Sequence, residues 1–102
     1  MIARYVTMTF RPEGVELFLK NFAENKDKIA AFSGCNFLTL QHDENEPNIY
    51  TTYSIWEKVE DLTAYRKSEL FYSVWSKVKP LFATKPETKT IDLTTAQFIE
   101  VN

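Results

Sequence analysis

The segment CNFLTLQHDENEPNIYTTYSIW, residues 35–56, decides the fold. Apolar and polar residues alternate over residues 35–42, and residues 48–56 are rich in β-branched and aromatic side chains. Alternation with a period of two is typical of a strand with one buried face, and a polar stretch such as DENEPN between two such runs is typical of a turn. The segment therefore predicts a hairpin of two antiparallel strands.

Toward the N-terminus, residues 2–10 also alternate, which predicts a third strand. Pro12 suits the first position of a helix, and Gly34, in the turn FSGC, is expected to stop that helix. Between them, apolar residues recur at helical spacing and predict one buried helical face. This face consists of Val15, Phe18, Leu19, Phe22 and Ile29.

Toward the C-terminus, EKVEDLTAYRK (57–67) predicts a short helical stretch, and SELFYSVWSKV (68–78) predicts a second one that Pro80 ends or kinks. Residues 85–102 are expected to form one long strand or two short ones, TKTIDL and AQFIEV, with a C-terminal strand extension at about 94–102. The apolar face of the second helical stretch consists of Leu70, Phe71, Val74, Trp75 and Val78.

The resulting order is strand, helix, strand, strand, helix, strand. It predicts an α+β fold, the ferredoxin-like split βαβ arrangement with an antiparallel sheet, as a single domain over residues 1–102. Helices would cover one face of the sheet, so a row containing Tyr5, Thr7 and Thr9 would lie open on the other face. We therefore expect a homodimer in which a second sheet covers this row.

Composition indicates which partners and which cellular compartment to expect. The chain has 102 residues, 15% of them aromatic, and a net charge of −2, which offers no positive field for nucleic acid. Its single cysteine, Cys35, excludes an intrachain disulfide and a cysteine-based zinc site. Arg4 interrupts the apolar run that a signal peptide needs, and no segment reaches the length of a membrane span. We expect a cytoplasmic protein with neither a nucleic-acid nor a membrane partner.

Several short motifs in this order carry a family resemblance. A strand ends in TF before Pro-Glu-Gly, a helix closes in FSGC, the hairpin ends in YSIWE, and AYRKSELF follows. Over roughly residues 2–93 the chain resembles the antibiotic biosynthesis monooxygenase (ABM) family. The resemblance implies a dimeric α+β barrel, with a pocket in each subunit between its helices and its sheet. Members include enzymes that oxidise phenolic or quinol-like molecules with O₂ alone, haem-degrading enzymes and isomerases.

The haem-degrading branch uses an Asn on the first strand, and a Trp and a His ten residues apart in the second helical region. Val6, Tyr65 and Trp75 occupy the aligned positions here, so the strongest iron ligand of that branch is missing. The resemblance therefore implies a cofactor-independent monooxygenase acting on a small hydrophobic, aromatic ligand, with no cofactor and no metal. A non-catalytic dimer that binds such a molecule, and an isomerase on the same scaffold, are the alternatives.

The quinone-forming branch of the family relies on Asn, Trp, Tyr and Arg side chains around a polycyclic phenol. Trp75, Tyr65, Tyr72 and Arg66 offer similar groups, with Trp75 and Phe71 as a pocket wall and the indole N–H as a donor. The same rings also fit a core stripe packed on the sheet. Arg66 fits a solvated helix residue as well as a ligand-binding one.

Arg4 is the sharpest anomaly, because it shares a strand face with the apolar Val6 and Met8. A buried guanidinium needs a partner, which would be an anionic substrate oxygen, a structural carboxylate, or solvent at the sheet edge. We expect His42 on the surface and Trp56 at the barrel rim or the dimer interface. Cys35 is expected to be an inert thiol. The candidate catalytic residues are Trp75, Tyr65, Tyr72 and Arg4, and the candidate substrate-binding residues are Val6, Arg66, Phe71 and Trp75.

Overall fold

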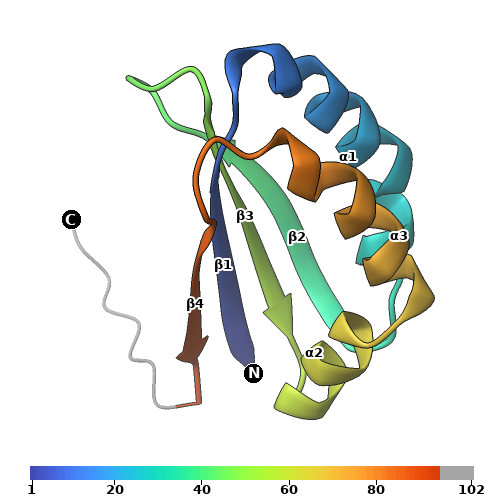
Figure 1. The fold of residues 1–102 in the computed structure, drawn as a ribbon. Helices are drawn as coiled ribbons and strands as arrows, with labels where there is room; N and C mark the ends of the chain where they lie inside the picture. Colours follow the sequence, from blue (N-terminus) through green and yellow to red (C-terminus); the bar gives the residue numbers. More distant parts are fainter. Residues whose placement is uncertain (95–102) are drawn as a thin grey trace, which may run out of the picture.

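The computed structural model describes residues 1–94. Four antiparallel strands form one sheet in the order β2-β3-β1-β4, and the helices all lie on one face of it (Figure 1). This is the predicted α+β, ferredoxin-like arrangement. The predicted AQFIEV strand lies outside the described residues. The strands are β1 (Ile2–Thr9), β2 (Cys35–His42), β3 (Ile49–Trp56) and β4 (Glu87–Asp92), and the helices are α1 (Val15–Ala30), α2 (Val59–Arg66) and α3 (Glu69–Val78).

The predicted hairpin is confirmed as β2 and β3, which pair in antiparallel register from His42 opposite Tyr50 to Cys35 opposite Trp56, with an irregularity near Cys35. In the polar turn, the Asp43 carboxylate accepts hydrogen bonds from the backbone N–H groups of Asn45 and Glu46. These bonds satisfy backbone N–H groups that have no partner on a neighbouring strand where the chain reverses. Asp side chains commonly make such bonds in turns. The hairpin therefore has local support at its tip.

Helix α1 follows a 3₁₀ turn at Pro12–Gly14 and ends at Ala30, four residues before the predicted stop at Gly34. Gly34 instead adopts a φ of +88° in the turn that leads into β2. A Cβ added there would lie 2.3 Å from the Asp61 Cγ atom on α2. The glycine therefore serves both a left-handed backbone conformation and a close approach of α2 to this turn.

Helices α2 and α3 are separated by a break at Ser68. The Ser68 hydroxyl donates to the carbonyl of Tyr65 at 2.6 Å and accepts from the N–H of Phe71 at 3.1 Å. It is thus the N-cap of α3 while it also satisfies the end of α2. Because of this break, Tyr65 and Phe71 approach the sheet from two helices with different axes. Pro80 lies in the 3₁₀ turn that follows α3, as expected.

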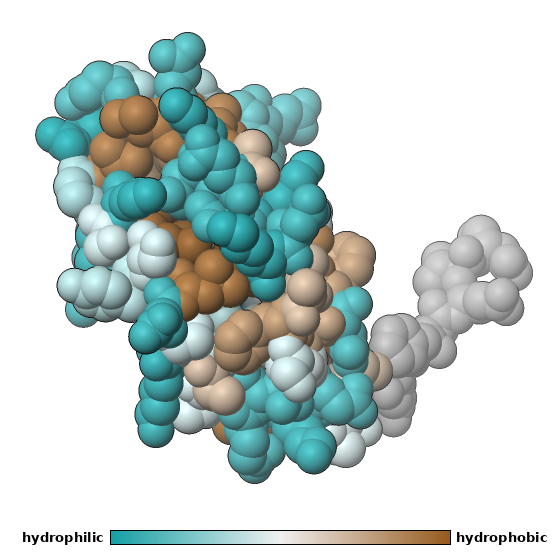
Figure 2. All heavy atoms as spheres, turned by 90° about the vertical axis from the view of Figure 1, so that its right-hand side faces the viewer, coloured by the Kyte–Doolittle hydropathy of each residue, from teal (hydrophilic) through white to brown (hydrophobic). Residues whose placement is uncertain are grey.

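The buried core lies between the helices and the sheet in two clusters. Apolar side chains also show between hydrophilic ones on the helical side of the molecule (Figure 2). We call the clusters the Phe10 cluster and the Trp56 cluster. The Phe10 cluster contains Val6, Met8, Phe10, Phe18, Tyr50 and Val78, and the Trp56 cluster contains Ile2, Ile29, Trp56, Leu62 and Tyr65.

The opposite face of the sheet carries no helix (Figure 1). Here the Tyr5 and Tyr53 rings pack with centroids 4.7 Å apart, and Phe37, which is half exposed, contacts Tyr53 edge-on at 5.9 Å. Thr7 and Thr51 share a hydrogen bond across the same face. The predicted open row is therefore aromatic as well as hydroxylated.

Candidate functional site

A cavity of about 310 Å³ lies between the sheet and the helices, and residues of both core clusters line it. Its volume is at the lower end of the range of roughly 300 to 1,000 Å³ that is typical of small-molecule sites. The cavity follows from the sequence of the sheet floor. Val6 lies opposite Thr52 on one side and Thr88 on the other, and Ser54 lies opposite Arg4. These short side chains leave space where larger ones would have joined the two clusters.

Aromatic rings form much of the wall. Tyr65 stacks on Trp56 at 5.1 Å and meets Phe71 edge-on at 5.3 Å, and Phe71 packs against Trp75 at 5.6 Å. All four rings line the cavity. Phe71 and Trp75 also pack, each partly buried, against a core cluster, so each is both core and cavity wall. The two interpretations of this stripe therefore apply together.

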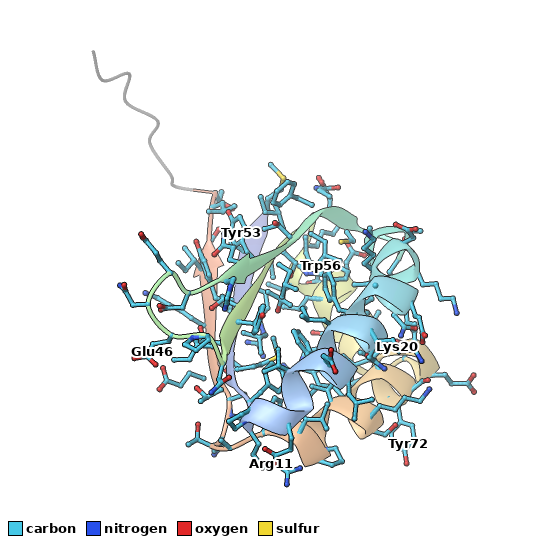
Figure 3. All side chains as sticks on the ribbon, turned by 90° about the horizontal axis from the view of Figure 1, so that it is seen from above. Arg11, Lys20, Glu46, Tyr53, Trp56 and Tyr72 are labelled. Atoms are coloured by element: carbon cyan, nitrogen blue, oxygen red, sulfur yellow. The ribbon has the colours of Figure 1, made fainter. Side chains whose placement is uncertain are left out.

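Trp56 corrects an expectation. It was expected at the barrel rim or the dimer interface, but its side chain is 1% exposed and lies between the sheet and the helices (Figure 3). Its indole N–H donates to the Ser54 hydroxyl at 2.9 Å. The reason is that Trp56 shares the inner face of β3 with Ser54, two residues earlier, and the helices cover this face. Its donor is thus already used within the core.

The cavity lining is cationic. Among residues 1–94, it contains the side chains of Arg4, Arg66 and Lys79 but no carboxylate. Arg4 donates to the Thr90 hydroxyl at 2.8 Å, and among the described residues no Asp or Glu lies within ion-pair distance of it. Partial burial, and after it the Arg66 guanidinium, lowers the pKa of Arg4. Arg4 nevertheless stays charged near neutrality, so an anion would relieve repulsion between the two guanidinium groups.

Tyr65 and Cys35 lie in surroundings that keep them protonated. Burial, and after it the neighbouring Cys35, raises the pKa of Tyr65 well above its ordinary value. Burial also raises the pKa of Cys35, and the thiol donates a hydrogen bond to the Phe37 carbonyl. The Tyr65 hydroxyl can therefore donate a hydrogen bond but cannot act as a general base near neutral pH.

The structure thus brings Arg4, Val6, Tyr65, Arg66, Phe71 and Trp75 together around one cavity. Tyr72 does not join them, because it is 76% exposed and lies at the outer edge of the helical layer (Figure 3). Its place on α3, one position from Phe71, turns it away from the sheet. His42 is exposed, as expected, and stacks on Tyr50 at 4.3 Å. It does not line the cavity.

Sequence reasoning missed several lining residues, of which Asn21 is the most informative. It is 8% exposed and lies on the buried face of α1 beside Phe18 and Phe22. The signal was present, because a polar residue three positions after Phe18 interrupts the apolar stripe. The other missed polar residues, which carried no such signal, are Thr52, Ser54, Lys79 and Thr88.

Two features are absent from residues 1–94. Within this range, no three His, Cys, Asp or Glu side chains lie close enough to hold a metal ion. No helix in the same range is both long and apolar enough to cross a membrane.

Comparison with known proteins gives a consistent picture. A family model described as antibiotic biosynthesis monooxygenase matches residues 1–74. None of the curated proteins compared with the chain matches it. Similar solved structures include an antibiotic biosynthesis monooxygenase with a TM-score of 0.85 and 16% identity, covering 90% of this chain and 97% of its own. A candidate antibiotic biosynthesis monooxygenase from Deinococcus radiodurans has a TM-score of 0.88 and 13% identity. The match covers 99% of this chain and 100% of that protein. A protein from Mycobacterium tuberculosis has a TM-score of 0.83 and 14% identity, covering 99% and 98%.

Proposed function

Because the chain belongs to the antibiotic biosynthesis monooxygenase family, we propose that it is a cofactor-independent monooxygenase acting on a small phenolic or quinol-like aromatic molecule. One observation carries the choice of substrate. In the part of the chain that the structure describes, an aromatic-walled cavity is lined by three cationic side chains, Arg4, Arg66 and Lys79, and by no carboxylate. Such a site favours a flat molecule that carries a negative oxygen.

The chemistry needs an electron-rich anion, which the site stabilises. A phenol that binds beside Arg4 and Arg66 loses its proton to solvent more readily, because the guanidinium groups favour the phenolate. The phenolate gives one electron to O₂, and the two radicals join to form a C–O bond and a peroxide anion. The hydrogen on that carbon then leaves as a proton while the O–O bond breaks. The ring keeps one oxygen as a quinone carbonyl, and the other leaves as hydroxide, which takes a proton to give water.

The remaining lining residues have supporting roles in this proposal. Trp75 and Phe71 hold the ring flat and exclude water. Tyr65, which stays protonated, donates a hydrogen bond to the developing peroxide. The proposal assigns no side chain as a base, since solvent accepts the phenol proton and the leaving oxygen atom accepts the ring proton.

Oxygen uptake under phenol and quinol substrates tests the proposal. With 1-naphthol or 1,5-dihydroxynaphthalene we expect protein-dependent O₂ consumption and one quinone formed per O₂. Arg4→Gln should weaken phenolate binding roughly tenfold, since a hydrogen bond to a charged group contributes about 1.5 to 3 kcal/mol and partial exposure reduces it. Lys20→Gln, on an exposed position of α1 (Figure 3), removes the same charge and should change nothing.

Binding without O₂ consumption would overturn the enzymatic proposal and favour the alternative of a non-catalytic binding protein. Equal effects of Arg4→Gln and Lys20→Gln would contradict the role of Arg4.

We further propose that the protein is a cytoplasmic homodimer formed through the open face of the sheet. The exposed ring of Phe37 and the half-buried rings of Tyr5 and Tyr53 on this face support the arrangement.

A further inference from the structure

The Asn21 carboxamide is an unexplained polar group in the core. Its Oδ1 atom is inaccessible to solvent and has no hydrogen-bond partner among the described residues. A buried acceptor left without a partner typically costs about 1 to 3 kcal/mol, whereas a leucine of similar size would bury apolar surface at this position. The local structure of α1 does not require the amide, because the helix bond network and the Asn25 side chain use only the backbone of Asn21.

Asn21 also faces the site described above. It belongs to the cavity lining and comes from the helical layer, whereas Arg4 comes from the sheet floor. The cationic residues in the lining are donors only, and the hydroxyl groups of Thr52, Ser54 and Thr88 both donate and accept. Asn21 supplies the one carboxamide among the described lining residues, and its broad terminal torsion allows Oδ1 to turn toward a ligand.

We propose that Asn21 determines specificity by accepting a hydrogen bond from a second hydroxyl group of the ligand. This inference rests on the proposed function and narrows the substrate class to aromatic diols bound as monoanions. One oxygen of such a molecule is negative and lies with Arg4 and Arg66, and the other keeps its proton and donates to Asn21. A simple phenol would occupy the same cavity but would leave Oδ1 without a donor.

Binding measurements under argon test the role of Asn21 separately from the proposed function. Calorimetric titration compares 1,5-dihydroxynaphthalene with 5-methoxy-1-naphthol, which keeps one acidic hydroxyl and lacks the second donor. 1-Naphthol, which is smaller, controls for the extra volume of the methyl group. Wild-type protein should bind the diol roughly tenfold more tightly than either analogue. In Asn21→Leu this preference should disappear, while the affinity for 1-naphthol should be unchanged or higher.

The unfolding midpoint of ligand-free Asn21→Leu is a second readout. It should equal or exceed that of the wild type, because the substitution removes a buried oxygen without a partner. A clearly lower midpoint would mean that the carboxamide has a structural partner, and it would overturn the inference. Equal wild-type affinity for the diol and its analogues would also overturn it, because a cavity water would then serve Oδ1 equally well. Binding of none of the three molecules would instead reject the proposed function, and this inference with it.

Discussion

Trp75 and Trp56 show how the same side chain can serve two purposes in one cavity. Trp56 is almost completely buried and hydrogen-bonded to Ser54, whereas Trp75 is partly exposed and borders the cavity on one side. Contacts that are absent on the cavity side cannot be lost on truncation. Trp75 should therefore contribute less than Trp56 to the free energy of unfolding. Its contribution to ligand affinity should be easier to measure, because the protein stays folded without it.

We predict that Trp75→Ala greatly weakens binding of 1-naphthol while the protein stays folded. Truncation of a fully packed aromatic residue typically costs about 3 to 5 kcal/mol, which we expect for Trp56→Ala. Trp75→Ala should cost clearly less. Denaturant midpoints of both variants, together with the ligand affinity of Trp75→Ala, provide the test. If Trp75→Ala lowers the midpoint as much as Trp56→Ala and the surviving protein binds normally, Trp75 is core filling only.

Tyr65 gives a prediction about alkaline pH. Burial raises its pKa in the folded protein, so above about pH 10 the unfolded chain loses this proton before the folded chain does. Protonated Tyr65 thus stabilises the fold below this pH, and the contribution falls by up to about 1.4 kcal/mol per pH unit as the pH rises further. Tyr65→Phe should lose this part of the pH dependence. Identical slopes of unfolding free energy against pH in the two proteins would contradict the prediction.

At the level of elements, the break between α2 and α3 positions the aromatic wall. Tyr65 lies in the last turn of α2, Phe71 lies in the first turn of α3, and the Ser68 hydroxyl bonds to the backbone of both. A continuous helix through this region would not direct both rings at the cavity, because residues 65 and 71 would then lie on different sides of one helix at 100° per residue. The cavity wall therefore depends on a capping residue that never touches the cavity.

We predict that Ser68→Ala lowers the free energy of unfolding by about 1 kcal/mol, as the loss of an N-cap typically does. It should also weaken ligand binding, because Tyr65 and Phe71 lose their common support. Ser76→Ala is the matched control, since the Ser76 hydroxyl is exposed and bonds only to the carbonyl of Ser73 in its own helix. Thermal unfolding of both variants checks the first effect, and calorimetric titration checks the second. If Ser68→Ala and Ser76→Ala change unfolding and ligand binding equally, Ser68 does not support the cavity wall in this way.

At the scale of the whole molecule, the two faces of the sheet differ in what covers them. The inner face, under the helices, carries the cavity, and the outer face carries Tyr5, Phe37 and Tyr53 without cover from the described part of the chain. Strand residues alternate between these faces, so a neighbouring pair such as Arg4 and Tyr5 contributes to both. The proposed dimer would bury the outer face and leave each cavity intact.

We predict that light scattering at micromolar concentration gives twice the subunit mass of 11.9 kDa. Tyr53→Glu should produce a folded monomer, because it places a charge within the outer aromatic row. Tyr72→Glu, on the exposed side of α3, should remain dimeric. A monomeric wild type would reject the dimer, and dissociation by Tyr72→Glu instead would move the interface to the helices.

The sequence by itself determined the order of the elements, the pairing of the central hairpin and the inner face of β1. These features depend on periodicity within short segments, and local periodicity can be read without knowing the fold. It also placed Arg4, Val6, Phe71 and Trp75 on faces directed at the same interior. The sequence did not show that α1 ends at Ala30 rather than at Gly34, because the turn that contains Gly34 depends on the close approach of α2.

Only the tertiary structure decided that these faces enclose a cavity. The space exists because short side chains from β3 and β4 meet beside Val6, and pairing between strands distant in sequence brings them there. The proximity of Arg4 to Arg66 and the burial of Trp56 likewise depend on contacts between separate elements. So does the lack, within residues 1–94, of a hydrogen-bond partner for the Asn21 Oδ1 atom. A sequence pattern assigns a residue to a face, but the neighbours across that face determine whether it packs, pairs or remains available to a ligand.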